Sequence, residues 1–352
     1  MSLEERLKLI EREPTEEIVT REELIKLLES KERIKHYIGI EISGPLHLGS
    51  LLVVGIKLRD LIKAGIDVTV FLADWHTYIN EKLGKDFGKI RAVAESYKKA
   101  YSAFVGEGIR FVYGSELYSS YKSYWEDLLR LATNVNIARV KRTLTVAGRS
   151  ESEDLTFAQM IYPLMQVNDI HALDVDLAHG GTDQRKAHML ARDVFPKMGW
   201  KVPVAIHHHL LPGLQQPEQD KGEEFSKMSK SKPHGAIFVH DSYEQIKEKL
   251  RRAWCPPGLV EGNPVLEIAK YIVFPLKGEF LLKRDVKYGG DVRYSSFEDL
   301  SRDYKAGKVH PFDLKLSLAD ELHSIMKPVR DKLVSDSEYV SVMESIGFSI
   351  EA

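Results

Sequence analysis

The sequence predicts an α/β protein in which a doubly wound parallel sheet is followed by a mainly helical domain. Over residues 34–211, short apolar runs alternate with amphipathic helical patterns, which is the order that builds parallel β–α–β units. After about residue 240 the strand-like runs stop, and helical patterns follow one another. We therefore expect one domain over residues 1–240 and a second over residues 241–352.

The individual elements follow from local patterns. Two charged helices are expected first, over residues 2–13 and 20–30, separated by Pro14, with Thr20 and Glu23 as a capping-box pair. Strands are expected at residues 34–42, 67–74, 109–113, 175–179 and 202–211. Further helices are expected at residues 47–64, 87–105, 120–134, 156–173, 183–195, 241–254, 264–276, 296–306 and 312–333. The tail beyond Ser335 is weakly patterned and is assigned no element.

Composition excludes several classes of protein. The single cysteine, Cys255, rules out an intrachain disulfide and is typical of a reducing, cytoplasmic environment. No apolar run approaches the ~18 residues of a transmembrane helix, and the N-terminus lacks the apolar core of a signal peptide. A net charge of −2 argues against nonspecific coating of nucleic acid, so any RNA contact must use local basic patches.

The first motif is the stretch from Tyr37 to Ser50. An apolar run breaks at Ser43-Gly44-Pro45, and a helical pattern then begins. A strand, a glycine-containing turn and a helix N-terminus together can hold a phosphate, and His47 offers a side-chain donor there. The stretch matches neither the dinucleotide fingerprint nor a Walker A loop. Taken alone, it is explained more simply as an ordinary β–α turn with a surface histidine.

The second motif is Lys227-Met-Ser-Lys-Ser-Lys232, which follows a polar, irregular segment over residues 215–226. Its lysines and serines could close over a triphosphate, although a solvated run of charge is the simpler alternative. A His-Leu-Gly-His-like turn followed by Lys-Met-Ser-Lys-Ser is the pair of signatures of class I aminoacyl-tRNA synthetases. The chain resembles that class in both motifs and in their order.

A polar stripe marks the helix expected at residues 156–173. Tyr162, Gln166 and Asp169 lie at i, i+4 and i+7, within roughly 60° of one another around the helix axis. On an otherwise apolar helix, such groups are costly unless they meet a ligand or each other. The alternative to a ligand site is a buried hydrogen-bond network between helix and sheet.

Together with Tyr37 and the run Gly180-Gly-Thr-Asp-Gln184, this stripe resembles the tyrosyl-tRNA synthetase family in its short archaeal and eukaryotic form. The resemblance extends from about Arg21 to Leu333. It implies a Rossmann-like catalytic domain, including the signature loop at residues 227–231, and a helical anticodon-binding domain. It also implies that the chain forms tyrosyl-adenylate from L-tyrosine and ATP, releases pyrophosphate, and transfers tyrosine to the 3′ end of tRNA(Tyr). ATP with Mg²⁺ and a cytoplasmic homodimer belong to the same expectation.

The resemblance assigns roles residue by residue. The catalytic residues are expected to be His47, Ser50, Lys227 and Lys230; Ser50 replaces the family's second signature histidine. Tyrosine is expected to contact Tyr37, Tyr162, Gln166, Asp169 and Gln184, with Tyr37 and Asp169 on the phenol. ATP is expected to contact Gly44, His47, Gly49, Gly181, Asp183, Lys227, Met228, Ser229, Lys230 and Ser231. The tRNA is expected to contact Arg142, Arg185, Tyr288, His310 and Asp313.

Some neighbouring residues are open to two interpretations. Leu117 and Tyr118 would wall the side-chain pocket and Asp74 and His76 would lie at its rim, or all four would serve packing at strand ends. Asp313 would accept hydrogen bonds from a base, or it would be a helix N-cap at a proline-containing turn.

The run His207-His-His209 is the remaining cluster of potential ligands. Neighbouring residues of a strand face opposite sides, so at most two of these rings could bind one metal ion. We therefore predict no protein-bound metal.

Three rival functions share parts of this pattern. A tryptophanyl-tRNA synthetase would share the fold and both signatures, but a stripe ending in Asp169 suits a phenol better than an indole, which is only a donor. A synthetase-like RNA-binding protein without charging activity would be expected to have lost His47, Lys227 and Lys230. A nucleotidyltransferase of the same superfamily would not need the helical domain.

Overall fold

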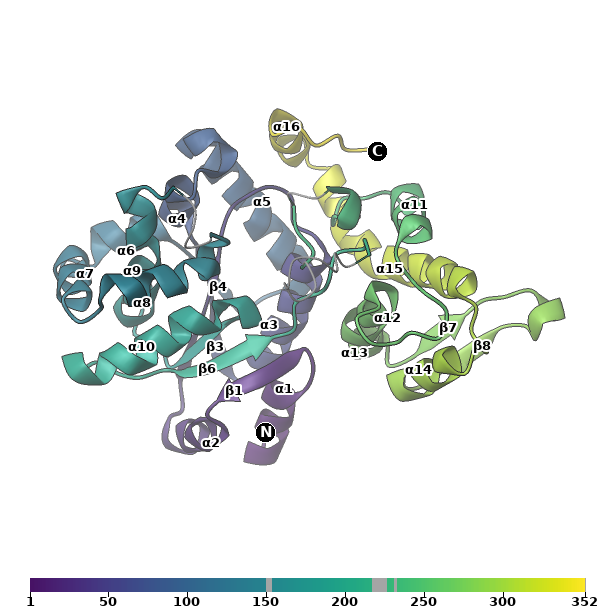
Figure 1. Cartoon of the computed structure of the whole chain (residues 1–352), viewed down its shortest axis with the longest axis horizontal. Coiled ribbons are helices and arrows are strands. Elements are labelled where there is room, and N and C mark those ends of the chain that lie inside the picture. The colour runs from purple at the N-terminus through teal and green to yellow at the C-terminus, as the bar shows by residue number, and fades with distance from the viewer. Residues whose placement is uncertain (150–153, 217–226, 231–232, 352) are drawn as a thin grey trace. The chain divides into compact units, whose positions relative to one another are not determined.

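The computed structural model describes residues 1–149, 154–216, 227–230 and 233–351 (Figure 1). The described residues form two compact units. The first comprises Met1–Ser43, Lys57–Lys98 and Val105–His209, and the second comprises Gly44–Ile56, Lys99–Phe104 and Leu210–Ala352. Each unit is described by itself. The predicted division at residue 240 is a division by function and stays a prediction.

The first unit is built on a six-stranded sheet in the order β1-β6-β5-β2-β3-β4. The strands are β1 (Thr15–Val19), β2 (Ile34–Ile40), β3 (Ile66–Leu72), β4 (Ile109–Tyr113), β5 (Leu177–Gly181) and β6 (Val204–His208). All neighbours are parallel except β1, which runs antiparallel to β6. The predicted α/β class and all five predicted strands are therefore confirmed, with a sheet that is mixed at one edge.

The edge strand β1 is one of the elements that sequence patterns missed. It lies between α1 (Leu3–Glu11) and α2 (Arg21–Ser30), where only a break at Pro14 was expected. An edge strand has one neighbour and stays partly exposed, so Thr15-Glu-Glu-Ile-Val19 carries charge and lacks an apolar face. The capping box predicted from Thr20 and Glu23 is confirmed at the start of α2.

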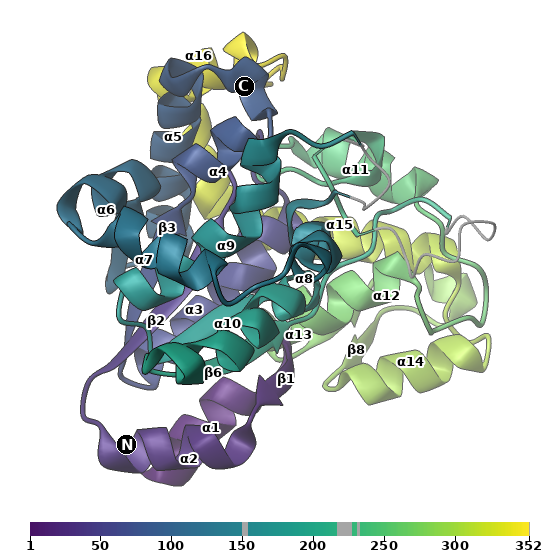
Figure 2. The same cartoon turned by 60° about the vertical axis from the view of Figure 1, so that its left-hand side comes forward.

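Helices cover both faces of the sheet. Those of the first unit are α3 (Val54–Lys63), α4 (Asp74–Ile79), α5 (Phe87–Val105), α6 (Gly114–Ser120), α7 (Tyr124–Ala132), α8 (Ile137–Thr143), α9 (Phe157–Ala172) and α10 (Arg185–Met198); α3 and α5 continue into the second unit. The helix expected over residues 120–134 is confirmed as α7, which begins at Tyr124. α6 was not expected, and the backbone becomes extended at Tyr121 between the two helices. Leu164 and Val167 of α9 pack with Leu190 and Phe195 of α10 in one apolar core, and Figures 1 and 2 show these helices on the same side of the sheet.

The order of the strands creates a switch point between β2 and β5. From β2 the chain proceeds outward through β3 to β4, whereas β5 and β6 extend the sheet in the opposite direction. In open α/β sheets, ligands bind at the carboxyl ends of the strands beside such a point. The segments after β2 and β5 are therefore where a ligand site is expected in this unit.

The second unit is mainly helical. It contains α11 (Tyr243–Arg252), α12 (Pro264–Ile268), α13 (Phe274–Lys277), α14 (Phe297–Lys305), α15 (Pro311–Val334) and α16 (Ser337–Ser345), and a π-helical turn over Ala269–Val273 joins α12 to α13. The expectation that strands stop after residue 240 is wrong, because β7 (Phe280–Leu282) and β8 (Val292–Tyr294) form an antiparallel pair. Three-residue strands are too short to produce an alternating pattern. Within the described residues, no helix has both the length and the apolar character that a membrane span requires.

Candidate active site

The polar stripe of α9 faces a buried site at the switch point of the sheet. Tyr162, Gln166 and Asp169 are all buried, as is Tyr37 on β2. Gln184, in the turn after β5, accepts a hydrogen bond at 2.9 Å from Gln166 Nε2. Burial raises the pKa of Tyr37 well above its usual value, and the nearby Asp169 carboxylate adds to this shift. The structure therefore brings together all five residues predicted to contact tyrosine.

Asp169 is the centre of this site and has no exposed surface. Tyr124 Oη donates to its Oδ1 at 2.6 Å, and Tyr118 Oη donates to its Oδ2 at 3.4 Å. His76 Nε2 lies 3.7 Å from the same Oδ2 atom. Burial raises the pKa of the Asp169 carboxyl well above its usual value, although the two hydroxyl donors oppose the shift. These donors are neutral, so they orient the carboxylate without cancelling its charge.

Five buried side-chain polar atoms have no hydrogen-bond partner within the described part of the chain, and two of them belong to residues of this site. These two are His76 Nε2 and Gln166 Oε1. Leaving a buried polar atom unsatisfied costs about 1–3 kcal/mol, so native proteins rarely do so without a reason. A polar ligand that brings both a donor and an acceptor would satisfy both atoms.

The sequence pattern overlooked Tyr124. This residue is fully buried on α7 and packs on the ring of Tyr118, with ring centroids 4.2 Å apart. A signal was available, because Leu128 and Leu131 follow Tyr124 at i+4 and i+7 and place its hydroxyl on the buried face of α7. The pattern alone does not identify Asp169 as the acceptor.

The residues considered for the wall and rim divide into two groups. Leu117 is part of the apolar core, while Tyr118 and His76 reach Asp169. Asp74 accepts hydrogen bonds from the backbone N–H groups of Trp75 and Ser115, at 2.9 and 3.0 Å. Asp74 thus joins the starts of α4 and α6, which is the packing role considered for it.

The first signature turn belongs to the second unit. Gly44 has a φ of +138°, a conformation that side chains rarely adopt. The chain then passes through an antiparallel bridge between His47 and Phe238 and enters a π-helical turn at Gly49–Val53. A Cβ atom at Gly49 would lie 3.2 Å from Cε1 of His47, so the bare Cα makes room for the histidine ring.

His47 and Ser50 bond reciprocally. His47 N donates to Ser50 Oγ at 2.9 Å, and Ser50 N donates to His47 Nδ1 at 3.3 Å. Burial lowers the pKa of His47 to about 3, with the charges of Lys230 and Lys227 adding to the effect. Since Nδ1 accepts a hydrogen bond, the neutral ring carries its proton on Nε2, where it can be donated to a ligand. The backbone N–H of Ser50 therefore sets the tautomer of His47, while the Ser50 side chain accepts from His47 N.

The second signature loop lies against the first. Met228 is buried, and its N–H donates to Leu211 O at 2.7 Å. A Cβ atom at Gly44 would lie 3.7 Å from Cδ of Lys230, so the lysine stem passes directly over the turn. The structure thus brings Gly44, His47 and Lys230 together, with Lys227 near enough to affect the pKa of His47. Ser229 is partly buried, and Ser231 lies outside the described residues.

The remaining ATP candidates follow β5. Gly181 is its last residue and is buried, and Asp183 lies in the short turn Thr182–Gln184 that leads into α10. A Cβ atom at Gly180 would approach Cβ of Gln184 to 2.7 Å, so this turn can fold back only over glycine. The negative charge of Asp183 opposes the burial that lowers the pKa of His208 to about 4.

Four of the predicted tRNA residues are exposed, and the fifth, Asp313, is partly buried. Arg142 is exposed on α8, and Arg185 at the start of α10 pairs with Glu17 at 2.9 Å. Tyr288 is exposed beside β8. His310 is the N-cap of α15, so the alternative interpretation of Asp313 as that N-cap is wrong; Asp313 lies in the first turn.

The histidines of β6 contact other histidines. His207 Nε2 lies 2.9 Å from His188 Nδ1, and His208 Nδ1 lies 2.9 Å from His179 Nε2, which leads in turn to His36. Burial lowers the pKa of His36 and His188 to about 3, so these rings are neutral at pH 7. Among the residues that the structure describes, no group of three His, Cys, Asp or Glu side chains converges on a metal position.

Comparisons with known proteins agree with this geometry. The family model described as tRNA synthetases class I (W and Y) matches residues 29–327. The tyrosine–tRNA ligase of Thermococcus sibiricus is 45% identical, over 98% of this chain and 99% of the relative, and that of Saccharolobus solfataricus is 45% identical over 99% and 98%.

Solved structures are similar over the whole length. Tyrosyl-tRNA synthetase from Pyrococcus horikoshii, complexed with L-tyrosine, has a TM-score of 0.92 and 43% identity, over 98% of this chain and 100% of that one. The enzyme from Aeropyrum pernix has a TM-score of 0.88 and 46% identity, over 98% of both chains. Tryptophanyl-tRNA synthetase from Aeropyrum pernix, at 21% identity and a TM-score of 0.70, shows a shared fold alone.

The chain therefore belongs to the class I tRNA synthetases of the tryptophan and tyrosine group. Within that group, its full-length identities assign it to the archaeal type of the tyrosyl-tRNA synthetase family. The resemblance inferred from the two signatures and the polar stripe is confirmed.

Proposed function

We propose that the chain is a tyrosine–tRNA ligase. It activates L-tyrosine with ATP to tyrosyl-adenylate, releases pyrophosphate, and transfers tyrosine to the 3′ end of tRNA(Tyr). The observation that carries this proposal is the site around Asp169, where a buried carboxylate is held by neutral hydroxyl donors beside two unsatisfied polar atoms. Relatives that are 45% identical to this chain over nearly their full length bear the name of the same ligase.

The amino acid is recognised through its phenol and its α-amino group. Asp169 Oδ2 accepts the phenol proton, and Tyr37 supplies the second phenol contact. Tyr162, Gln166 and Gln184 hold the amino group, and Gln166 Oε1 is an acceptor that is available for it. Phenylalanine brings no hydroxyl and would leave these buried polar groups unsatisfied, which is the basis for rejecting it.

Adenylate formation needs positioning more than acid–base chemistry. The tyrosine carboxylate is already a nucleophile, and it attacks the α-phosphorus of ATP while pyrophosphate leaves. His47 donates from Nε2, and Lys227 and Lys230 donate from their ammonium groups, to the phosphate oxygens on which charge accumulates. Gly44, Gly49 and Gly181 allow close approach, and Asp183 accepts from a ribose hydroxyl. Mg²⁺ arrives with ATP, held by its phosphates, and shares their charge.

Several residues of the two signature motifs act on the nucleotide through their neighbours. The backbone N–H of Ser50 fixes the Nε2–H tautomer of His47. A histidine at this position would supply the same N–H, so this bond does not replace the contribution of the second signature histidine. Met228, Ser229 and Ser231 belong to the loop that carries Lys227 and Lys230. Lys230 acts chiefly in the transition state, so its loss lowers the rate of activation more than the affinity for tyrosine.

Recognition of tRNA involves exposed residues of both units. Arg142 and Arg185 face the acceptor stem, and the ion pair of Arg185 with Glu17 is exposed enough for a phosphate to replace it. Tyr288, His310 and Asp313 read anticodon bases by stacking and hydrogen bonding, which makes residues 241–352 the anticodon-binding domain.

The chain works in the cytoplasm as a homodimer. Large apolar side chains stay exposed on and after α7, namely Trp125, Leu129 and Ile137. Trp125 and Leu129 are one helical turn apart and form a stripe that a second copy of the chain can cover. Sedimentation of the wild-type chain tests this assembly, and a monomer at micromolar concentration would contradict it.

The decisive experiment is amino-acid-dependent exchange of pyrophosphate into ATP, without tRNA, across all twenty amino acids. Exchange with tyrosine alone is expected. Exchange with tryptophan would keep the mechanism and overturn the assignment of the pocket. No exchange with any amino acid would favour an RNA-binding protein without charging activity.

A further inference from the structure

The proposed function gives no residue of the C-terminal tail a contact with tyrosine, ATP or tRNA. The tail comprises α16 and residues 346–351 (Figure 1). Asp336 caps α16 by accepting from the N–H groups of Glu338 and Tyr339. After α16, Gly347 takes a φ of +88°, and Phe348 N donates to Met343 O at 3.0 Å. This turn ends α16.

Ion pairs and hydrogen bonds attach the tail at both ends. Lys99 Nζ lies 2.7 Å from Asp336 Oδ2 and 2.6 Å from Glu338 Oε2, at the start of the tail. At its other end, Ser242 Oγ donates to Glu351 Oε2 at 2.7 Å. Arg330 of α15 donates to the backbone oxygen of the same Glu351. Tyr339 is almost completely buried between these attachments.

The tail packs on the segment that pairs with the first signature turn. Phe348 meets Phe238 edge-on, with ring centroids 5.3 Å apart, and Phe238 stacks on His240 at 5.6 Å. Tyr339 Oη lies 2.8 Å from His240 Nδ1. Phe238 is the bridge partner of His47, and the residues on either side of it bond Leu46 and Leu48 at 3.0 Å. Phe238 is therefore in contact with the tail and with the signature histidine.

Phe348 also reaches the signature turn directly. A Cβ atom placed on Gly44 would lie 3.8 Å from Cε2 of Phe348. The same Cβ atom would lie 3.7 Å from Cδ of Lys230. The Phe348 ring and the Lys230 stem thus both pack over Gly44. These three residues are more than a hundred positions apart in the chain, and they belong to the tail and to the two signature motifs.

We propose that the C-terminal tail is a positioning element for the nucleotide. Phe348 packs against Gly44 and Phe238, and Tyr339 fixes His240. Together they hold the first signature turn in the position from which His47 and Lys230 reach the triphosphate. The proposal rests on the proposed function for the identity of the nucleotide. It adds two residues, Phe348 and Tyr339, which act through the signature motifs and do not themselves touch the reacting atoms.

The test compares Phe348→Ala with the conservative variant Phe348→Leu. Affinity for ATP is measured by equilibrium dialysis, and the KM values for ATP and tyrosine are measured by pyrophosphate exchange. Phe348→Ala is expected to weaken ATP binding and raise the ATP KM by about tenfold, because displacement of positioning groups by about 1 Å has large effects. The tyrosine KM should stay within about twofold, since the tyrosine residues belong to the other unit. Phe348→Leu should recover most of the loss.

Further variants separate positioning from general damage. Tyr339→Phe removes one hydroxyl and should shift ATP affinity in the same direction by a smaller factor. Truncation after Ser335 should have the largest effect on ATP. Leu259→Ala, at a partly exposed site of the second unit, and Ser349→Ala, at an exposed tail position, should leave both KM values unchanged.

Two results would overturn the proposal. One is an ATP affinity in Phe348→Ala equal to that of the wild type. The other is an equal loss of tyrosine and ATP affinity, which would indicate a structural role only. Dialysis with ATP does not depend on turnover, so a wild-type chain without tyrosine-dependent exchange would refute the proposed function and still leave the tail tested.

Discussion

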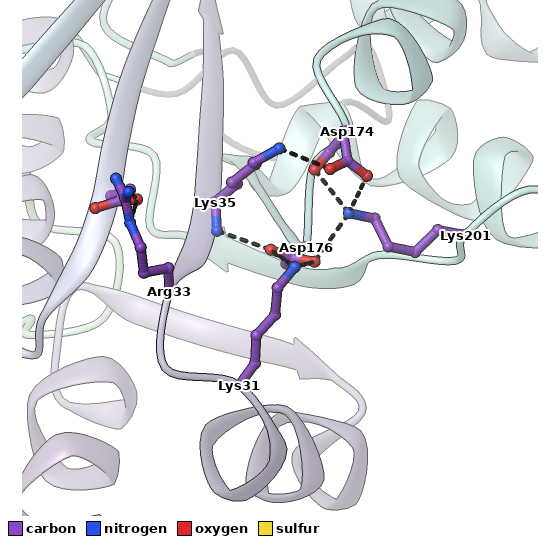
Figure 3. Close-up of polar contacts among 7 residues, drawn as sticks. Lys31, Arg33, Lys35, Asp174, Asp176 and Lys201 are labelled. Atoms are coloured by element: carbon purple, nitrogen blue, oxygen red, sulfur yellow. Dashed lines mark hydrogen bonds and ion pairs between the residues drawn. The ribbon is translucent and has the colours of Figure 1, made fainter.

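Two buried aspartates of the first unit have opposite surroundings. Asp169 is 0% exposed and Asp176 is 3% exposed. Neutral hydroxyls donate to Asp169, whereas Asp176 accepts from Lys31 Nζ at 2.6 Å, Lys201 Nζ at 2.9 Å and a backbone N–H at 2.8 Å (Figure 3). Burial alone would raise both pKa values. It does so for Asp169, while the hydrogen bonds from Lys31 and its neighbours lower the pKa of Asp176.

The comparison distinguishes a structural carboxylate from one that is available to a ligand. Lys35 and Lys201 also contact Asp174, at 2.7 and 2.5 Å. Three lysines and the two aspartates that precede β5 therefore form one group, called here the lysine cluster: Lys31, Lys35, Lys201, Asp174 and Asp176 (Figure 3). Within this cluster, charges neutralise one another and join β2 to β5. The hydroxyls that donate to Asp169 are neutral and burial raises its pKa, and carboxyl groups in such surroundings are found where ligands bind.

The largest expected effect is on catalysis. Asp169→Asn keeps the shape of the side chain and removes the acceptor of the phenol proton, so kcat/KM for tyrosine in pyrophosphate exchange should fall by about 10²-fold or more. Asp176→Asn should leave kcat/KM close to that of the wild type. Unchanged preference for tyrosine over phenylalanine in Asp169→Asn would refute its role at the phenol.

The second expected effect is on stability, and here Asp176 is the aspartate whose replacement matters. Asp176→Asn leaves Lys31 and Lys201 without their shared buried partner and should lower the free energy of unfolding by about 2 kcal/mol, a value reduced because both lysines are partly exposed. Urea denaturation at pH 7 measures this difference. A variant as stable as the wild type would show that the lysine cluster contributes little.

A smaller effect is expected at the hydroxyl that orients Asp169. Tyr124→Phe removes the donor to Oδ1 and keeps the packing of the ring, so selectivity for tyrosine over phenylalanine should fall by about tenfold. Tyr101→Phe is a matched control, because Tyr101 is also buried but donates to the backbone oxygen of Ser50. Equal effects of the two variants on selectivity would contradict a specific role for Tyr124.

The smallest expected effect is on the pH dependence of stability, which has opposite signs for the lysine cluster and for Asp169. The pKa of Asp176 is lowered and that of Asp174 is lowered to about 2, so their contribution to stability is fully present above about pH 4 and is lost as pH falls toward 2. The pKa of Asp169 is raised, so its ionisation costs stability as pH rises above about 4. Thermal unfolding at pH 7 should therefore show Asp169→Asn at least as stable as the wild type. A clearly lower melting temperature would contradict the raised pKa.

Local patterns predicted much of the fold and part of the site. The alternation of strands and helices follows from short-range periodicity, and so does the stripe on α9. The elements that were missed are β1, β7, β8, α4, α6, α8 and α16. Each strand among them is short or at an edge, and each helix among them is short, so none has a periodic pattern long enough to recognise.

The sequence by itself determined the order of the elements, the glycine turns and the residue types of the two signatures, because these depend on neighbours along the chain. Only the tertiary structure decided that Tyr124 orients Asp169 across 45 positions and that Phe348 packs over Gly44. It also decided that lysines donate to Asp176 whereas neutral hydroxyls donate to Asp169. Contacts of this kind depend on which distant residues the fold brings together, and no local periodicity encodes them.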